Sequence, residues 1–401
     1  MTRVAVTGLG VIAPHGGDHV TMFEAVVQGT SAVRPIFPEL AKPAAAAVVD
    51  FDPAPWFTKL QLAGVDRVSQ MAVAAATQAL LDAGAAGAAS PERTGVYAGC
   101  GMGGAAALET AYRSGGRISP LTIPAFMPNA PAAQVALRHG VQGPVLTYSV
   151  ACASGAVAIS EAAAAVARGD VDLAIAGGSE ALLVPGVVLA WQALQTLATF
   201  EPGREAEACR PYCRDRTGFV LGEGAAFLVL ERAEAARARG ARVYAHLAGH
   251  GLTCDATHLT RPDAGGQARA MRQALDRAGL APSDVGYCNA HGTATKVGDA
   301  VECEALHTVF GSAAMNGLKV SSTKGVHGHL LGAAGALEAV ITVKALHERR
   351  LPPNANLRAV DPQCQLDLVV DPDTRAPRLA AAISSSFAFG GTNSVLAFTR
   401  P

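Results

Sequence analysis

The sequence predicts an α/β protein made of two related halves. Short apolar runs bounded by glycine alternate with long alanine-rich segments, which is the pattern of strands and helices around a largely parallel sheet. Half of the 401 residues are hydrophobic, but aromatic residues make up only 5%. Side chains this small allow helices to pack closely on a sheet, and the chain is long enough to bury a large core.

The first half carries clear strand and helix signals. A helical segment at 65–83 ends at Gly84 and another, at 152–168, ends at Gly169, because glycine readily adopts the left-handed conformation that closes a helix. Strands are expected at 3–7, 145–150 and 173–176, the last of them ending at Gly177 and Gly178.

The second half repeats this plan. The helix end Ala79-Leu-Leu-Asp-Ala-Gly84 corresponds to Ala274-Leu-Asp-Arg-Ala-Gly279, and each is followed by a strand that runs into a glycine-rich loop. The strand at 145–150, which enters an alanine-rich helix, likewise corresponds to a strand at 318–324, whose helix begins after His329. We therefore predict an N-terminal half and a C-terminal half, tightly joined, at residues 1–236 and 237–401.

Composition excludes several classes of protein. The formal net charge of −1 gives no general attraction to nucleic acid or to an anionic membrane. No run of about 18 apolar residues predicts a membrane-spanning helix, and glycine and threonine interrupt the apolar N-terminal run, which indicates a strand and not a signal peptide. The eight cysteines show neither a C-x-x-C pair nor zinc-like spacing, so we expect reduced thiols, no metal and a cytoplasmic location.

Two glycine motifs resemble dinucleotide-binding fingerprints. Gly8-Leu-Gly-Val-Ile-Ala13 fits G-x-G-x-x-A, and Gly99-Cys-Gly-Met-Gly-Gly104 fits G-x-G-x-x-G. Such a fingerprint requires a helix that starts within the motif. Pro14 follows the first motif and a loop-like run of glycine and alanine follows the second, so we expect no nicotinamide cofactor.

Cys152 is the strongest candidate nucleophile. It lies in Val150-Ala-Cys-Ala-Ser-Gly155, directly after a predicted strand and before a helix of small residues. A helix N-terminus offers free N–H groups and the positive end of the helix dipole, which favour the thiolate form of a cysteine. A sharp strand-to-helix turn also exposes the sulfur to a pocket. Most cysteines are inert core residues, but this position favours a catalytic one.

Two histidines lie at comparable places in the second half. His291 follows a strand in Asn289-Ala-His-Gly-Thr-Ala-Thr295, and His329 precedes a helix in His327-Gly-His-Leu-Leu-Gly332. Loops at the carboxyl ends of strands carry the ligand-binding residues of α/β folds. A single histidine is usually structural or solvated, but two at equivalent junctions favour a shared catalytic site.

With these motifs the chain resembles the β-ketoacyl–acyl-carrier-protein synthases, in particular the type II elongating enzymes and the nodulation-type synthases close to them. The resemblance extends from Val4-Ala-Val-Thr-Gly-Leu-Gly to Phe387-Ala-Phe-Gly-Gly-Thr-Asn393 and includes A-C-A-S-G, N-A-H-G-T-x-T, and S-S-T-K with G-H-L-L-G-A-A-G. Together these motifs are highly specific. They imply a thiolase-like fold of two pseudo-duplicated halves, each with a mixed, largely parallel sheet, layered α-β-α-β-α.

The resemblance also implies a role for each residue of the site. Cys152 would hold the acyl group, while His291 and His329 would donate hydrogen bonds to the enolate that forms when malonate loses CO2. Lys324 would support the histidines, with Glu302 as its ion-pair partner. For Asp299 and Glu302 a solvated acidic helix face is the alternative. The further implied roles are an oxyanion hole of the Cys152 and Phe389 N–H groups, a gate at Phe389, a supporting carboxylate at Asp299, and pantetheine contacts from Thr293 and Thr295.

Four positions depart from the family pattern. Ala388 stands where a glycine usually separates the two phenylalanines of the gate, which restricts positive φ and predicts a stiffer loop. His327 lies close to His329 and competes with it for the catalytic role, for which we favour His329. Lys296 replaces a common proline, and Thr217 replaces an aspartate.

The implied activity is the decarboxylative Claisen condensation of an acyl-enzyme with malonyl-acyl carrier protein in fatty acid or polyketide synthesis. The products are a 3-ketoacyl-carrier, CO2 and free carrier protein. Both substrates arrive on phosphopantetheine, so no other cofactor is expected. The implied partners are the acyl carrier protein and a second copy of the chain. Because the carrier is acidic in this family, we expect a basic rim around the pocket, with Arg67, Arg204 and Arg210 as candidates.

Two alternatives remain open on the sequence. The first is a partner subunit that shapes the pocket of a second synthase in a heterodimer, although such subunits typically lose the nucleophile that Cys152 provides. The second is a degradative thiolase, which would use Cys-His-Cys chemistry, whereas the segment after Lys324 supplies a histidine. Met127 falls where related synthases line the acyl pocket across the dimer interface, and it suits a core position equally well.

Overall fold

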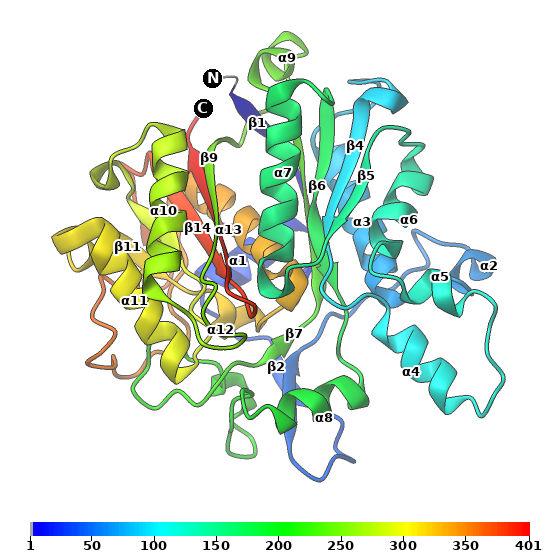
Figure 1. Cartoon of the computed structure of the whole chain (residues 1–401), viewed down its shortest axis with the longest axis horizontal. Helices are drawn as coiled ribbons and strands as arrows, with labels where there is room; N and C mark the ends of the chain where they lie inside the picture. The colour runs from blue at the N-terminus through cyan, green and yellow to red at the C-terminus, as the bar shows by residue number, and fades with distance from the viewer. Residues whose placement is uncertain (1–2) are drawn as a thin grey trace.

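The chain, described from residue 3 to residue 401 in a computed structural model, alternates strands with helices (Figure 1). The elements of its first part are β1 (Val4–Ile12), α1 (His19–Val27), β2 (Val33–Ile36), β3 (Ala44–Ala47), α2 (Lys59–Leu62), α3 (Arg67–Asp82), β4 (Thr94–Gly99), α4 (Ala105–Arg113), α5 (Thr122–Phe126), α6 (Ala130–His139), β5 (Val145–Tyr148), α7 (Ser154–Arg168), β6 (Leu173–Glu180), α8 (Pro185–Ala193), β7 (Leu221–Gly222), β8 (Gly224–Arg232) and α9 (Ala233–Ala238).

The second part begins with a long central strand and ends with a hairpin. Its elements are β9 (Ala245–Cys254), α10 (Ala264–Ala278), β10 (Tyr287–Asn289), α11 (Lys296–Phe310), β11 (Lys319–Ser321), α12 (Lys324–His327), α13 (Ala334–Glu348), β12 (Arg350–Leu351), β13 (Thr374–Arg375), β14 (Ala381–Phe387) and β15 (Thr392–Thr399).

The central sheet consists of two sets of five strands with the same internal order. Across the sheet the strands follow one another as β11-β10-β14-β15-β9-β1-β8-β6-β4-β5, and the two sets meet where β1 pairs antiparallel with β9. In the first set β4 is parallel to β5 and β6, while β6, β8 and β1 are antiparallel neighbours. In the second set β10, β11, β14, β15 and β9 repeat this arrangement. The prediction of a mixed sheet with two related halves is confirmed. The two sets nevertheless join in one ten-stranded sheet, and only four of its nine strand pairings are parallel, so the sheet is less parallel than expected.

Helices complete five layers. α7 and α13 lie between the two sets of strands, α3 and α6 cover the outer face of the first set, and α10 and α11 cover that of the second (Figure 1). This is the predicted α-β-α-β-α order. The helical stretch Ala151–Arg168 is long and apolar enough to cross a membrane, but 72% of it is buried inside the fold, as expected for a core helix.

Glycines allow the outer helices to pack directly on the strands. A Cβ atom on Gly10 of β1 would lie 1.9 Å from the carbonyl oxygen of Ala75 in α3. A Cβ atom on Gly251 of β9 would lie 1.9 Å from that of Ala270 in α10, at the equivalent place in the second half. Helix–sheet contact therefore explains the first glycine motif without a nucleotide.

The expectation that a strand ends at Gly177 is wrong. β6 continues to Glu180, because Gly177 and Gly178 lie within the strand and do not form a turn. A Cβ atom on Gly177 would lie 2.0 Å from the carbonyl oxygen of Ala226 in β8. Glycine is thus required here because β6 and β8 lie close together, and not because the chain turns.

We expect Gly10→Ala to destabilise the fold. The added methyl group would collide with the backbone of α3, and overpacking of this kind typically costs about 1–3 kcal/mol or more. The melting temperature, measured by differential scanning calorimetry, should fall. Gly17→Ala is the control, since no atom lies within 4 Å of a Cβ placed there. Equal melting temperatures for the two variants would show that α3 does not pack on β1 as described.

Candidate active site

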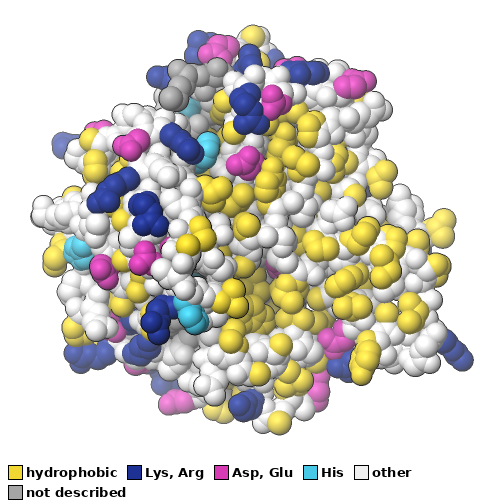
Figure 2. Space-filling model, in the orientation of Figure 1, with side chains coloured by type: hydrophobic (Ala, Val, Ile, Leu, Met, Phe, Trp, Pro, Cys, Tyr) yellow, Lys and Arg dark blue, Asp and Glu magenta, His cyan; other side chains and the backbone are white. Residues whose placement is uncertain are grey.

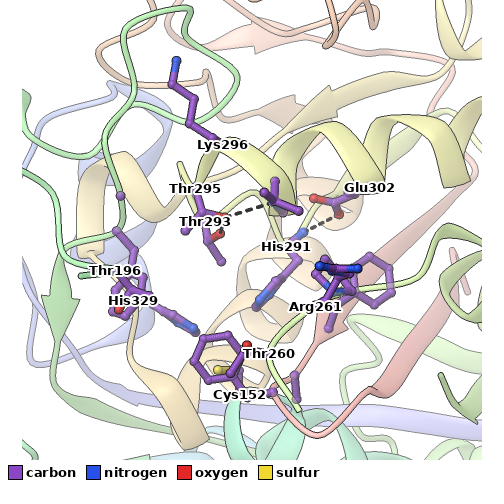
Figure 3. Close-up of a pocket in the computed structure, with 18 of the residues that line it drawn as sticks. Cys152, Thr196, Thr260, Arg261, His291, Thr293, Thr295, Lys296, Glu302 and His329 are labelled. Carbon is purple, nitrogen blue, oxygen red and sulfur yellow. Dashed lines mark hydrogen bonds between the residues drawn. The ribbon is translucent and has the colours of Figure 1, made fainter. Parts of the chain in front are cut away.

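A cavity of about 390 Å³ brings together most of the residues that the sequence indicated (Figure 3). They arrive from both halves of the chain, at the ends of α7, β10, β14 and the segment before α13. The predicted residues that line the cavity are Cys152, His291, Thr293, Thr295, Glu302, His329 and Phe389. Lys324 and Asp299 lie behind this wall, where both are fully buried.

Cys152 lies in a tight turn between β5 and α7. The 3-10 turn Ala151–Ala153 begins at Ala151, whose φ of +48° is costly for a residue with a Cβ. The Ser154 hydroxyl holds this turn, because it accepts the N–H of Val150 at 2.9 Å and donates to the carbonyl of Ala151 at 2.7 Å. The turn directs the sulfur into the cavity and leaves Cys152 only 7% exposed.

Burial opposes the thiolate form that the helix N-terminus was expected to favour at Cys152. Burial raises the pKa of the thiol to about 12, because an anion loses its hydration in this site. The ammonium group of Lys324 and the N–H of Phe389, which hydrogen-bonds the sulfur, lower the pKa but do not offset burial. Attack on a thioester must therefore be coupled to loss of the thiol proton.

His291 and His329 present matching N–H groups to the cavity. Leu331 donates its N–H to Nδ1 of His329 at 3.3 Å, and Nζ of Lys324 lies 3.4 Å from Nδ1 of His291. Since Nδ1 accepts in both rings, each neutral imidazole carries its proton on Nε2. The ring centroids are 5.3 Å apart and the rings lie edge to face. Both rings point toward the space above Cys152 (Figure 3).

Both imidazoles are neutral at pH 7. Burial lowers the pKa of His291 and of His329 well below the usual value, and the nearby charge of Lys324 lowers both further. A neutral imidazole cannot neutralise a carboxylate, but its Nε2–H can donate to a developing oxyanion. The pair is therefore suited to stabilise an enolate without holding back a departing CO2.

Lys324 pairs with Glu338 and not with Glu302, so the predicted ion pair is wrong. Nζ of Lys324 forms an ion pair with Glu338 of α13, with neither side chain exposed, and donates to the carbonyl of His291 at 2.5 Å. Glu302 instead accepts the N–H groups of His291 and Gly292, both at 2.7 Å. Both carboxylate oxygens of Glu302 thus accept backbone N–H groups, and it is Glu338, on the central helix α13, that contacts Lys324.

Asp299 and Glu302 hold the loop that follows β10. They lie one turn apart on the inner side of α11 and are 0% and 2% exposed, which excludes the solvated acidic face. Asp299 accepts the N–H of Ala294 at 3.0 Å and that of Tyr212 at 2.8 Å, beside the guanidinium of Arg216 at 3.3 Å. The two carboxylates therefore position the catalytic loop through its backbone.

Two buried carboxylates of the site were missed on the sequence. Glu338 is the one charged residue in the apolar first part of α13, from Ala334 to Val343, and such an isolated charge is a signal for a buried partner that the sequence argument did not use. Glu180, at the end of β6, accepts the N–H groups of Gly101 at 2.8 Å and Gly332 at 3.0 Å. It joins the loop after β4 to the turn after His329, and its position in the sequence gave no signal of this role.

His327 faces away from the cavity. Its Nε2 lies 2.8 Å from the hydroxyl of Thr323 and its Nδ1 lies 2.8 Å from the carbonyl of Gly328. Burial lowers the pKa of His327 to about 3. Both ring nitrogens of His327 therefore have hydrogen-bond partners within its own segment. Of the two histidines, only His329 lines the cavity.

The gate segment carries no strain at Ala388. Positive φ is found at the next two glycines, Gly390 at +87° and Gly391 at +80°, and not at Ala388. Ala388 donates its N–H to Thr392 at 2.8 Å and so continues the hairpin between β14 and β15. The predicted stiffening through restricted φ therefore has no basis in this conformation of the loop.

The walls above the cysteine are of two kinds. The hydroxyls of Thr293 and Thr295 lie 3.0 Å apart, and Thr295 also caps α11. The ring of Trp191 packs between Phe219 and Phe389, with centroid distances of 5.4 and 6.1 Å. The lining therefore combines hydroxyl groups with an aromatic surface, which is typical of a small-molecule site.

The three arginines expected at the rim do not line this cavity. Each is paired with a carboxylate that neutralises it. The pairs are Arg67 with Glu223, Arg204 with Glu201 and Glu207, and Arg210 with Asp215. The cationic side chains that do line the cavity are Arg261 and Lys296.

The fold and site define a condensing enzyme of the thiolase-like type, in which a cysteine faces two neutral imidazoles. The chain belongs to the beta-ketoacyl synthase family. The family model of the beta-ketoacyl synthase N-terminal domain matches residues 1–236, and that of the C-terminal domain matches residues 244–358.

Curated relatives and solved structures agree with this family. The chain is 38% identical over 410 residues to 3-oxoacyl-[acyl-carrier-protein] synthase 2 of Staphylococcus aureus (strain COL), covering 99% of this chain and 98% of that one. It is 42% identical over 407 residues to Nodulation protein E of Rhizobium meliloti, with 99% of each chain covered.

Two solved structures extend the comparison. The ishigamide ketosynthase/chain length factor superposes with a TM-score of 0.92 at 32% identity, covering 100% of this chain and 99% of that one. A type II polyketide synthase acyl-carrier protein in complex with its ketosynthase bound to the hexaketide gives a TM-score of 0.91 at 30% identity, with the same coverage.

We expect alkylation of Cys152 by iodoacetamide to rise about tenfold per pH unit between pH 7 and 10. Only the thiolate reacts, and with a pKa of about 12 its fraction still increases in proportion to hydroxide over this range. Peptide-resolved mass spectrometry measures the rate, with the exposed Cys254 in the same digest as the internal reference. A rate that levels off below pH 8.5 would show that the helix N-terminus does stabilise the thiolate.

Proposed function

We propose that this chain is a 3-oxoacyl–acyl-carrier-protein synthase. The observation that carries the proposal is the meeting of one cysteine and two neutral Nε2–H donors in a single buried cavity. A Claisen condensation needs an acyl electrophile held on a nucleophile and a stabilised enolate beside it. The named relatives, which are synthases of this class, support the same reaction.

In the first half-reaction the acyl group moves to Cys152. The sulfur attacks the thioester carbonyl of an acyl-carrier, and the tetrahedral oxyanion accepts the N–H groups of Cys152 and Phe389. When the adduct collapses, the bond to the pantetheine sulfur breaks and the thiol proton of Cys152 ends on the departing pantetheine thiol. Transfer from one thiol to another is therefore proton-neutral, which suits a cysteine with a raised pKa.

In the second half-reaction malonyl-carrier binds beside the acyl-cysteine. The bond between C2 and the carboxylate breaks, CO2 leaves, and the electron pair moves onto the thioester carbonyl oxygen. His291 and His329 donate their Nε2–H groups to this enolate oxygen. C2 then attacks the acyl carbon and the bond to the Cys152 sulfur breaks. The sulfur leaves as a thiolate and takes up one proton from water, which restores the thiol, and the 3-ketoacyl-carrier is released.

The supporting residues act on the histidines and on the arm. Lys324 donates a hydrogen bond to Nδ1 of His291, which keeps this nitrogen an acceptor. Glu302 and Asp299 accept backbone N–H groups of the loop that carries His291. The hydroxyls of Thr293 and Thr295 would contact the pantetheine arm. All chemical groups come from the chain and from the substrates on phosphopantetheine, so no further cofactor is needed. The free cysteines of the fold suit the reducing cytoplasm.

The proposed assembly is a homodimer formed at the β5 edge. β5 pairs only with β4 within residues 3–401, so its outer edge is open to another strand. Hydrophobic side chains gather over this side of the molecule (Figure 2). The exposed members are Leu108, Tyr112, Ile118, Leu121, Ile123, Met127, Leu137, Val145 and Leu146. An apolar surface of this extent around an open strand fits a second copy of the chain.

A heterodimer with a related subunit is the second candidate assembly. It is favoured by the likeness to the ishigamide ketosynthase/chain length factor, whose two components are named together. In that assembly this chain would be the catalytic component, because Cys152, His291 and His329 are all in place.

The reaction is tested by separating its two halves. We expect wild type incubated with a panel of acyl-carriers to gain the mass of one acyl group, and Cys152→Ala to gain none. His291→Ala and His329→Ala should still be acylated, but their release of CO2 from malonyl-carrier should fall by about a hundredfold or more, the usual cost of losing one oxyanion donor.

His307→Gln is the matched control, since this half-buried histidine of α11 lies outside the cavity, where its Nε2 is 2.8 Å from the carbonyl oxygen of Gln365. Normal CO2 release by both alanine variants would overturn the enolate assignment. Absence of acylation from every carrier by folded wild type would overturn the proposal for the chain acting alone and would favour the heterodimer.

The proposed dimer is tested by a substitution that places a charged side chain in the interface at β5. Leu146 of β5 is 45% exposed, and Leu146→Lys should convert a homodimer to a monomer in light scattering, because a buried unpaired ammonium is costly. Met315→Lys, at a residue that is 56% exposed in the second half of the chain, should leave the mass unchanged. A monomeric wild type at micromolar concentration would contradict the homodimer.

A further inference from the structure

Glu180 is a buried carboxylate beside the site that neither half-reaction uses. It is the last residue of β6, and its side chain is 0% exposed. Its Oε2 accepts the N–H groups of Gly101 at 2.8 Å and Gly332 at 3.0 Å, and its Oε1 accepts that of Met102 at 3.3 Å. A carboxylate is costly to bury, so one that holds backbone next to a reacting group is a candidate for a role in the reaction.

Two of these partners are glycines that let the carboxylate lie directly against the backbone. A Cβ atom on Gly101 would lie 2.6 Å from Oε2 of Glu180, and one on Gly332 would lie 2.4 Å from the same oxygen. The loop after β4 and the turn after His329 therefore meet on a single oxygen atom. The sequence separates these two segments by more than half of the chain.

The turn after His329 is the segment that connects Glu180 to the chemistry. Leu331, which precedes Gly332, has a φ of +49°, a costly value for a residue with a Cβ. The φ and ψ angles of a residue relate its own N–H to the peptide unit that follows it. The hydrogen bond from Gly332 to Glu180 fixes that following unit, and it thereby also fixes the direction of the Leu331 N–H.

The Leu331 N–H decides which nitrogen of His329 carries the proton. It donates to Nδ1 at 3.3 Å, so the neutral ring keeps its proton on Nε2. The ring lines the cavity and points toward the space above Cys152 (Figure 3). Without a donor at Nδ1 the proton can move to that nitrogen, and Nε2 would then present a lone pair to an enolate.

The backbone of His329 is held separately, by the segment that contains β7. Its N–H donates to the carbonyl of Val220 at 2.7 Å, and its carbonyl accepts the N–H of Gly222 at 2.9 Å. These two contacts keep the histidine at the cavity wall. Loss of Glu180 should therefore change the protonation of the ring and leave the ring in place.

We propose that Glu180 is a positioning residue for the condensation. Through Gly332 and Leu331 it keeps the proton of His329 on Nε2. This inference rests on the proposed function, in which His329 donates to the enolate. The transfer of an acyl group to Cys152 uses no group of this turn, so Glu180 should affect the release of CO2 and not the acylation.

A double-mutant cycle tests whether Glu180 acts through His329. Glu180→Ala should lower the rate of CO2 release from malonyl-carrier about tenfold, because a buried N–H loses its acceptor, and should leave acylation within about twofold of wild type. In the His329→Ala background the same substitution should cause no further loss, since the ring that it positions is absent. In the His291→Ala background it should again lower the rate about tenfold.

Glu180→Gln is the conservative variant and should restore most of the activity. Its amide oxygen can still accept the N–H groups of Gly101 and Gly332, and only the longer contact with Met102 is lost. We expect CO2 release within about threefold of wild type. Glu180→Asp keeps the charge but withdraws both oxygens by one carbon. The same cycle applies to Glu180→Asp if Glu180→Ala does not fold.

Glu231→Ala is the control for the loss of a buried carboxylate. Glu231 is 2% exposed and pairs across the sheet with Leu173, the first residue of β6, so it lies at the opposite end of the strand from Glu180. Both half-reactions should be unchanged in this variant. The rates are compared at about pH 8.5, where Glu180 is ionised although burial raises its pKa to about 7.

Nitrogen NMR of isotope-labelled histidine rings reads the proposed effect directly. The signals of His329 are assigned by their absence in His329→Ala. In wild type the protonated ring nitrogen should be Nε2. In Glu180→Ala a second form, with the proton on Nδ1, should appear, and in Glu180→Gln it should not.

The outcomes separate this inference from the proposed function. A further loss of CO2 release on adding Glu180→Ala to His329→Ala, an unchanged tautomer in Glu180→Ala, or an equal loss of acylation would each overturn the positioning role and leave the synthase intact. Normal CO2 release by His329→Ala, or none by wild type, would instead overturn the proposed function.

Discussion

The site depends on the close crossing of the two central helices. A Cβ atom on Gly155 of α7 would lie 2.9 Å from the backbone nitrogen of Ala336, and one on Gly335 of α13 would lie 2.9 Å from that of Ala156. Only glycine allows backbones this near to each other. The crossing places the start of α7, with Cys152, beside the start of α13 and its preceding turn.

The backbone is also strained just before each of these two helices. Ala151 and Leu331 have φ values of +48° and +49°, and each begins a 3-10 turn that leads into its helix. The strained conformation persists because the surrounding contacts hold the backbone in place. At Ala151 it exposes the sulfur of Cys152, and at Leu331 it directs an N–H to Nδ1 of His329. Pseudo-duplication thus produced two related turns that carry different chemistry.

Burial then decides the charges of the site. It raises the pKa of Cys152 and lowers those of both histidines, so the nucleophile and the donors are neutral. Lys324 stays inside because Glu338 and a backbone carbonyl complete its shell. Because the nucleophile and both donors are neutral, none of the three reacting groups has a charge that must be desolvated when a thioester enters.

The sequence determined the reacting residues and the architecture. Cysteine and histidine at strand-to-helix junctions, and glycine-marked repeats, are local signals, since the turn, the helix start and the strand are each encoded within a few residues. The tertiary structure alone decided the partner of Lys324, the protonation of Cys152 and which arginines remain unpaired. These depend on distance and burial between different segments of the chain, and no local spacing encodes them.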